Sequence, residues 1–310
     1  MYNEEQKACF IRSYTQSEKT AKIAVGVFNI CESYEKAYNS DLCMMDTDKL
    51  QKIVDAVAGV RAASKWSRLS ILRAYTKWCL AEGVPNATGN MNKINFVGLG
   101  KIRNTMVANP MHLQTYLNAV FEEETLNTID ILYRCYLWLG YGGIRESDLF
   151  KVKVSDVQFE NMEVHYGLKT VYLYREAVPA FMRAVNSDKF TYLHPNYSTE
   201  IGRIPGDELL RGIKGNMNIM TMRARLSRYA KEAVSAGRTE QHISFTRAAL
   251  SGIFYRAYEL ERYGDIPDFE SAVDEFMFGK EYAIGWDAAR KKLLREYLED
   301  YQRWKLAFSV

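Results

Sequence analysis

The sequence is poor in residues that break helices or bind metals. It contains only 6 prolines and 19 glycines among 310 residues, which favours long helices over a turn-rich sheet sandwich. It also has only 4 histidines and 5 cysteines, and no two cysteines form a CxxC pair. Free thiols of this kind are typical of a reducing compartment. We therefore expect neither a metal site nor a cofactor.

Long hydrophobic runs and an excess of one charge are missing as well. No apolar stretch approaches the ~18 residues that a membrane span requires. The first residues, MYNEEQKACF, carry acids and no apolar signal-peptide segment. Lys and Arg number 41 against 38 Asp and Glu, a net charge of +3. We expect a soluble protein inside the cell without a membrane partner, in which any nucleic-acid surface must come from local clusters of charge.

The first part of the chain has the pattern of amphipathic helices. Apolar residues recur at three- and four-residue spacing, which predicts helices over 4–15, 18–37, 47–58 and 64–82. The segment that follows, up to residue 103, is rich in glycine and asparagine and breaks this pattern. We therefore predict a helical domain over 1–88, a linker over 89–105 and a second domain over 106–310.

The second part changes its period twice. A nearly all-apolar segment at 127–141 predicts a buried central helix. Alternating β-branched and aromatic residues within 162–175, with GLK between them, predict two short antiparallel strands. Helical spacing then returns, which predicts helices over 176–186, 206–214, 220–236, 245–262, 268–278 and 285–308. The expected fold class is mainly α with one small antiparallel β-sheet.

Two segments are basic although the whole chain is not. No acid occurs from Val57 to Ala81 or from Leu209 to Lys231. One such run is as compatible with a solvated helix face as with a ligand site. Two runs, one in each predicted domain, favour a clamp around a polyanion such as double-stranded DNA. The candidate phosphate-binding residues are Arg61, Lys65, Arg68, Arg223, Arg225 and Arg228.

The segment YLWLGYGGIRESDLFKVKVSD, which starts at Tyr136, carries the most specific motif. A buried helix leads into a glycine turn, and then Gly143, Ile144, Arg145, Ser147, Asp148 and Leu149 follow. This pattern resembles the first signature box of the tyrosine recombinase (phage integrase) family. Taken alone, Arg145 is better interpreted as an arginine at a helix N-terminus that forms a surface salt bridge. The resemblance implies that Arg145 is the family's first catalytic arginine.

Further residues follow in the order of that family. Lys169 lies at the predicted hairpin turn, where the family has a catalytic lysine. In SFTRAALSGIFYRAY, Arg247 falls at the second catalytic arginine, and Ser244 falls where the family has a histidine. His242 is a partial substitute if the backbone shifts. The first part of the chain resembles the family's SAM-like core-binding domain, so the resemblance covers nearly the whole chain.

The last two family positions are less clear. Lys280, in MFGK, or Trp286 falls at the third box, and Trp286 is also compatible with an ordinary core tryptophan. The resemblance implies a nucleophilic tyrosine near the end of the chain, and we expect Tyr297 first, Tyr301 second and Tyr282 as a further alternative. Tyr297 and Tyr301 share one predicted helix face, and the chain has 21 tyrosines, so core packing is the competing interpretation.

These residue types suit DNA strand transfer without ATP. A tyrosine stores the energy of the phosphodiester as a 3′-phosphotyrosine ester. Two arginines bind the negative charge of the transition state, and a lysine protonates the leaving oxygen. The resemblance implies a site-specific DNA recombinase or integrase of a mobile element, cytoplasmic in a bacterium or encoded by a phage, which assembles as a tetramer on DNA. The alternative is a recombinase-fold protein that binds DNA without catalysis, because Ser244 replaces the histidine.

Overall fold

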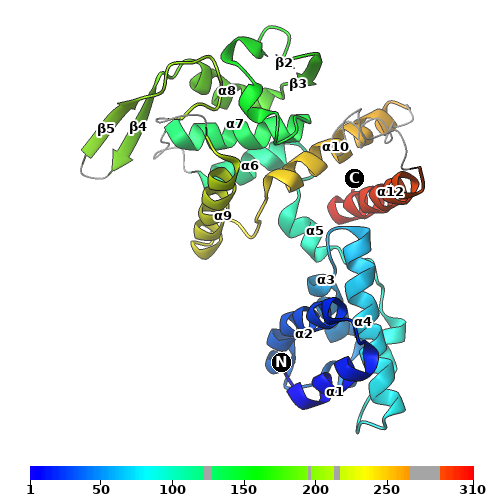
Figure 1. The fold of residues 1–310 in the computed structure, drawn as a ribbon. Helices are drawn as coiled ribbons and strands as arrows, with labels where there is room; N and C mark the ends of the chain where they lie inside the picture. The colour runs from blue at the N-terminus through cyan, green and yellow to red at the C-terminus, as the bar shows by residue number, and fades with distance from the viewer. Residues whose placement is uncertain (122–127, 195–196, 213–216, 265–286) are drawn as a thin grey trace. The chain divides into compact units, whose positions relative to one another are not determined.

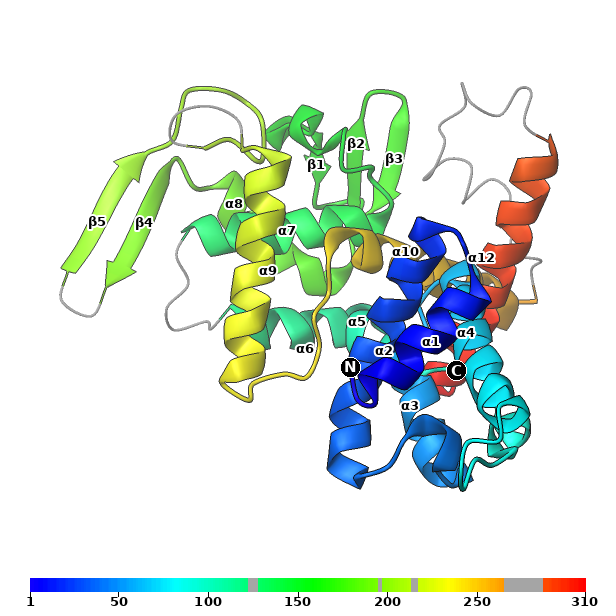
Figure 2. The ribbon, with the colours of Figure 1, turned by 60° about the horizontal axis from the view of Figure 1, so that its bottom comes forward.

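The computed structural model describes residues 1–121, 128–194, 197–212, 217–264 and 287–310. This part of the chain is mainly helical with small antiparallel sheets, which confirms the predicted fold class (Figures 1 and 2). The chain divides into two compact units. Unit 1 consists of Met1–Arg103 with Arg295–Val310, and unit 2 consists of Asn104–Leu294. None of the described helices is both long and apolar enough to cross a bilayer.

Unit 1 is built from helices around one hydrophobic core (Figure 1). Side chains next to the helix starts satisfy free backbone donors, as when Ser17 Oγ accepts the N–H of Thr20. Its elements are α1 (Glu4–Tyr14), α2 (Glu18–Tyr38), the 3₁₀ helix η1 (Leu42–Met44), α3 (Thr47–Val57), α4 (Ala62–Ala81), the 3₁₀ helix η2 (Asn90–Lys93), the first residues of α5 (Gly100–Thr105) and the last part of α12 (Asp287–Phe308).

The division of the chain differs from the predicted domains in two places. The predicted linker 89–105 is largely part of unit 1, because Met91 and Ile94 are buried in the core of that unit. The C-terminal residues 295–310 also belong to unit 1 rather than to the unit that precedes them. The glycine-rich composition of 83–103 therefore marks irregular chain packed on a helical core, and the change of unit comes at residue 104.

Unit 2 has a core of its own, centred on the helix that the sequence predicts to be buried. Every residue of α7 (Thr128–Gly142) is buried, and α8, α10 and β4 all contact it. Figure 2 shows α7 running between the helices of this unit and its three-stranded sheet. Among the described residues, unit 2 also contains the helices α6 (Pro110–Val120), η4 (Leu149–Lys151), η5 (Val154–Asp156), η6 (Arg175–Ala177), α8 (Val178–Val185), α9 (Ile219–Ser235) and α10 (Phe245–Arg262).

The predicted hairpin is present, and it belongs to a three-stranded antiparallel sheet. The strands β2 (Glu163–Tyr166) and β3 (Lys169–Tyr172) pair in a register that sets Val164 opposite Val171. The short strand β1 (Val157–Gln158) pairs with β2 on its other side. The alternating burial of β2 follows from its alternating apolar and polar residues, so this part of the sheet was readable from the sequence.

A second sheet forms between the predicted helices 176–186 and 206–214, in a segment for which the sequence predicted no element. The strands β4 (Lys189–His194) and β5 (Tyr197–Gly202) form an antiparallel hairpin, so the prediction of a single sheet is wrong. In both ribbon views this hairpin extends away from the helices of unit 2 (Figures 1 and 2).

The sequence also predicts a helix over 206–214, and this prediction is wrong for its described residues, 206–212. Their backbone pairs with the segment around Lys153 instead. The N–H of Leu209 donates to Val152 O at 2.9 Å, and the N–H of Val154 donates to Asp207 O at 2.7 Å. The predicted helix over 268–278 lies outside the described residues.

Candidate functional site

Arg145 follows a tight glycine turn at the end of α7. The turn passes through Gly143, whose φ of 110° strongly favours glycine. The side chain of Arg145 is 34% exposed, and its Nε donates to Asp148 Oδ2 at 3.1 Å. Burial would raise the pKa of Asp148, but a hydrogen bond from Lys151 and the charges of Arg145 and Lys151 outweigh burial and lower it. Asp148 therefore remains ionised and holds the Arg145 guanidinium in place.

A second arginine, Arg256 of α10, braces the same turn. Its Nη1 donates to the carbonyl oxygen of Tyr141 at 2.8 Å. A Cβ atom added to Gly143 would lie 3.2 Å from Arg256 Nη2, which is a tight contact. Arg256 was not predicted as a site residue from the sequence. The sequence feature that could have indicated it is its position in the same helical segment as Arg247.

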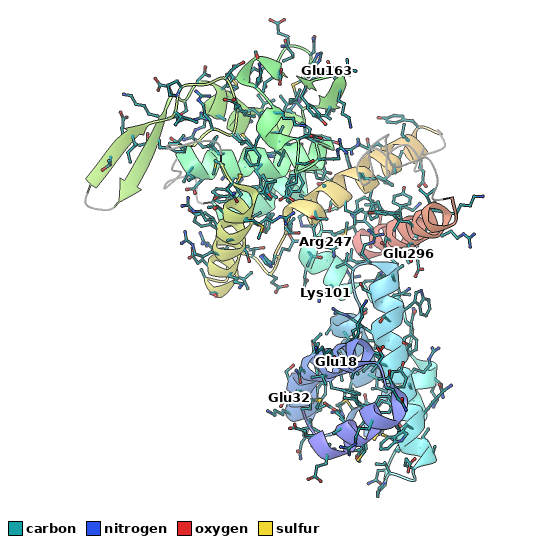
Figure 3. The ribbon with its side chains drawn as sticks, viewed as in Figure 1. Glu18, Glu32, Lys101, Glu163, Arg247 and Glu296 are labelled. Atoms are coloured by element: carbon teal, nitrogen blue, oxygen red, sulfur yellow. The ribbon has the colours of Figure 1, made fainter. Side chains whose placement is uncertain are left out.

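Arg247 lies in the first turn of α10, where Figure 3 labels it. Ser244, at the family's histidine position, is the N-cap of this helix, and its Oγ accepts the N–H of Arg247 at 3.4 Å. Ser251 donates to Arg247 O at 2.8 Å and accepts the N–H of Val107 at 3.1 Å. Local capping therefore fixes the backbone of Arg247, and Ser244 has a structural role that a serine fills well.

The helix α7, which leads to Arg145, and the helix α10, which carries Arg247, are in close contact at two glycines. A Cβ atom on Gly252 would lie 1.9 Å from the carbonyl oxygen of Tyr141, and one on Gly140 would lie 2.5 Å from the ring of Phe245. Only hydrogen in place of a side chain permits so close a crossing of α7 and α10. The turn that bears Arg145 and the first turn of α10 are thereby held on one pair of packed helices.

Lys169 lies at the turn of the β2–β3 hairpin, as predicted. It pairs with Tyr166, and Gly167, with φ of 58°, and the fully exposed Leu168 form the turn between them. The hairpin reaches the end of α7, because a Cβ atom on Gly142 would lie 3.4 Å from Tyr172 O. Lys169 and Arg145 are thus both carried by segments that adjoin the C-terminal end of α7.

His242, the possible substitute for the missing histidine, is held by its backbone. Its N–H donates to Asn104 O at 2.9 Å. Desolvation and the charge of Lys231 lower the pKa of its imidazole, which is therefore mostly neutral at pH 7. In the described ranges no three His, Cys, Asp or Glu side chains are placed to hold a metal ion.

Two of the tyrosines predicted as nucleophiles, Tyr297 and Tyr301, belong to unit 1, whereas Arg145, Lys169 and Arg247 belong to unit 2. Tyr297 and Tyr301 are 1% and 0% exposed. The guanidinium of Arg61 stacks on the Tyr297 ring at 3.8 Å, and Tyr301 stacks on Trp304. The competing interpretation, core packing of this helix face, therefore describes both residues in this structure. Tyr282, Lys280 and Trp286 lie outside the described residues.

Arg61 and Lys65, two of the three basic residues predicted to bind phosphates in the first part of the chain, form ion pairs within unit 1. Arg61 pairs with Asp300 at 2.5 Å, and Lys65, whose side chain is 5% exposed, pairs with Glu299. Arg68 lies farther along α4 and donates to Val57 O at 3.3 Å. The sequence shows no acid near this run because its acidic partners come from the far end of the chain.

The basic residues of α9 are more exposed. Arg223 forms an ion pair with Glu146, which also accepts a hydrogen bond from a tyrosine of α7. Arg228 is 3.6 Å from Glu232, and Arg225 is exposed. The helix therefore offers cations on its surface, although Arg223 is tied to the residue that follows Arg145.

Residues 1–81 match the family model described as "MrpR, N-terminal core-binding domain". The prediction of a core-binding domain in the first part of the chain is confirmed. No curated protein sequence matches the chain significantly.

Two solved structures illustrate the structural similarity. The crystal structure of XerA recombinase is 14% identical over 95% of this chain and 98% of that chain, with a TM-score of 0.38. The Tn1549 transposon integrase in complex with circular intermediate DNA is 13% identical over 93% of this chain and 98% of that chain, with a TM-score of 0.37. With TM-scores below 0.5, this likeness does not extend to function or mechanism.

Proposed function

We propose that this protein binds duplex DNA with a recombinase-type pair of domains and does so without a covalent step. The observation that carries the proposal is the placement of Arg145, Lys169 and Arg247 on segments packed at one helix pair. Three cationic side chains on neighbouring segments favour an anionic ligand, and Asp148 accepts a hydrogen bond from one of them, Arg145. Phosphates of duplex DNA are such a ligand, and Arg and Lys supply most of the contacts to them.

Unit 1 adds a second surface with the same chemistry. Along α4, Arg73 and Lys77 are exposed, and Trp66 is 51% exposed. These three residues line a shallow groove of about 210 Å³, together with Ser70. Cationic side chains and hydroxyl groups are among the groups that contact DNA backbones. Because this helix lies within the segment that matches a core-binding domain, we propose that its exposed face follows the phosphates.

Binding without catalysis fits the state of the nucleophile candidates. A phenol attacks a phosphodiester only if its oxygen reaches the phosphorus. Tyr297 and Tyr301, which belong to unit 1, are buried, and Ser244 supplies a helix cap where the family has a histidine. On this proposal the protein acts in the bacterial cytoplasm.

Fluorescence anisotropy with a labelled mixed-sequence duplex tests the DNA binding. We expect a Kd of about 10⁻⁴–10⁻⁶ M at physiological salt that weakens steeply as salt rises. Replacing both Arg73 and Lys77 by alanine should flatten the slope of log K against log salt by about 1.8, because each phosphate contact contributes about 0.9. Lys52→Ala, at an exposed site on α3, is the control and should leave the slope unchanged. A wild-type protein with no affinity for DNA would refute the proposed function.

Strand transfer through a 3′-phosphotyrosine is the second candidate function. The observation in its favour is the same set of Arg145, Lys169 and Arg247, which matches in type and order the cations that activate a phosphodiester. Strand transfer requires a tyrosine, from this chain or from a neighbouring copy, to lie close to these three cations. This second function also includes self-association of the protein on DNA.

A denaturing gel separates the two functions. We expect a mobility shift on native gels that disappears under denaturation, because no covalent bond forms. If a protein–DNA adduct survives denaturation with candidate attachment-site DNA, strand transfer is correct. The substitutions Tyr297→Phe, Tyr301→Phe and Tyr282→Phe then identify the nucleophile, since only the variant that lacks the attacking hydroxyl loses the adduct while it keeps DNA binding.

A further inference from the structure

Carboxylates from α12 occupy the cations at the start of α4, within unit 1. Asp300 Oδ1 accepts the backbone N–H of Ala62 at 2.6 Å, and Arg61 Nε lies 2.5 Å from Asp300 Oδ2. One turn farther along α4, Glu299 accepts a hydrogen bond from Lys65 and another, at 3.4 Å, from Trp66 Nε1. The two acids follow each other in sequence and bind successive positions of one helix face.

The two carboxylates differ in how deeply they are held. Asp300 is 2% exposed, and burial raises its pKa to about 6 although Arg61 and Arg303 lie beside it. Glu299 is 36% exposed, so water reaches it while it binds Lys65. Lys65 is 5% exposed, so the carboxylate is the side of this ion pair that faces water. Glu299 is therefore the exchangeable member of the pair.

The groups that donate hydrogen bonds to Glu299 are also able to donate hydrogen bonds to a DNA phosphate. A lysine ammonium and a tryptophan N–H each bind any oxyanion of suitable size. Lys65 and Trp66 also adjoin the exposed polar face of α4, where Trp66 lines the shallow groove with Arg73 and Lys77. A duplex that follows that face would meet Glu299 where its next phosphate should bind.

We infer that Glu299 competes with a DNA phosphate for Lys65 and Trp66, so that the C-terminal helix lowers the affinity of the core-binding domain for duplex DNA. This inference rests on the proposed DNA binding and assigns a function to Glu299 of α12. In the competing state, Lys65 exchanges the carboxylate of Glu299 for a phosphate oxygen, and no covalent bond changes.

Glu299→Gln tests the inference, with Glu296→Gln as its matched control. Both substitutions remove one negative charge from the same helix, and Figure 3 labels Glu296 on α12. In the described contacts, Glu299 is the one that bonds Lys65. We expect Glu299→Gln to raise duplex affinity about three- to tenfold at low salt and to steepen the salt slope by about one, because one more phosphate contact forms. Glu296→Gln should change affinity less than about twofold, by its charge alone.

Repeating the Glu299→Gln substitution in a Lys65→Gln protein tests whether the rise in affinity depends on Lys65. In a protein that carries Lys65→Gln, the Glu299→Gln change should no longer raise affinity, because the competing cation is gone. An equal rise with and without Lys65, or equal effects of Glu299→Gln and Glu296→Gln, overturns the inference while the proposed function stands. Absence of DNA binding in the wild type and in every variant overturns the proposed function itself. Unchanged circular dichroism and melting temperature of each variant exclude misfolding as the cause.

Discussion

Replacing Arg303 with alanine should lower the free energy of unfolding by about 3–5 kcal/mol. The guanidinium of Arg303 is 3% exposed and donates to four carbonyl oxygens of unit 1. These belong to Gly59, Val60, Val97 and Gly98, at 2.7–3.0 Å. Its loss would leave four buried acceptors without their donor, and each such group costs about 1–3 kcal/mol before relaxation.

Urea unfolding followed by circular dichroism measures this effect, and tryptophan fluorescence adds a local probe. Trp304 is fully buried beside Arg303 in sequence, so release of the helix end should shift its emission to longer wavelength. Arg295→Ala, at an exposed site of the same helix, is the control and should change stability by less than about 0.5 kcal/mol. A loss below about 1 kcal/mol for Arg303→Ala would mean that α12 is not anchored through this side chain.

Local signals in the sequence were enough for most helices and for the hairpin of unit 2. Each of these elements has its own period, and α7 is nearly all apolar because it is buried along its whole length. The segment 206–212 shows where such signals fail. Leu209 and Leu210 are buried as a helix pattern would predict, but the backbone around them is fixed by distant partners. The N–H of Leu209 donates to Val152 O at 2.9 Å and the N–H of Val154 donates to Asp207 O at 2.7 Å, and neither bond is visible in a local pattern.

The candidate site was predictable in part for the same reason. The glycine turn before Arg145 and the cap before Arg247 are local features, and both elements are present. The environments of Arg61 and Lys65 are not local, because their partners are more than 230 residues away in sequence. A run without acids therefore does not establish a free basic surface. The spacing of Tyr297, Tyr301 and Trp304 predicted one packed face, but not that this face packs in unit 1.

Gly252→Ala should lower the free energy of unfolding by about 3 kcal/mol or more. The added Cβ would lie 1.9 Å from the carbonyl oxygen of Tyr141 and 2.8 Å from its carbonyl carbon. These are backbone atoms of a helix that is buried along its whole length, so they cannot rotate away as a side chain would. Relief requires α7 and α10 to move apart, which the surrounding core resists.

The same separation should weaken DNA binding at temperatures where the variant is still folded. Arg256 joins α10 to the turn before Arg145, and Arg247 lies on α10 itself, so moving the helices apart displaces the proposed phosphate contacts from one another. Thermal unfolding and anisotropy on one sample measure both effects.

Gly26→Ala is the matched control, because Gly26 is inside α2 and its added Cβ would meet no atom within 4 Å. That substitution should stabilise the protein by up to about 1 kcal/mol through helix propensity. Equal melting temperatures for the two variants would show that the glycine contact does not set the spacing of α7 and α10.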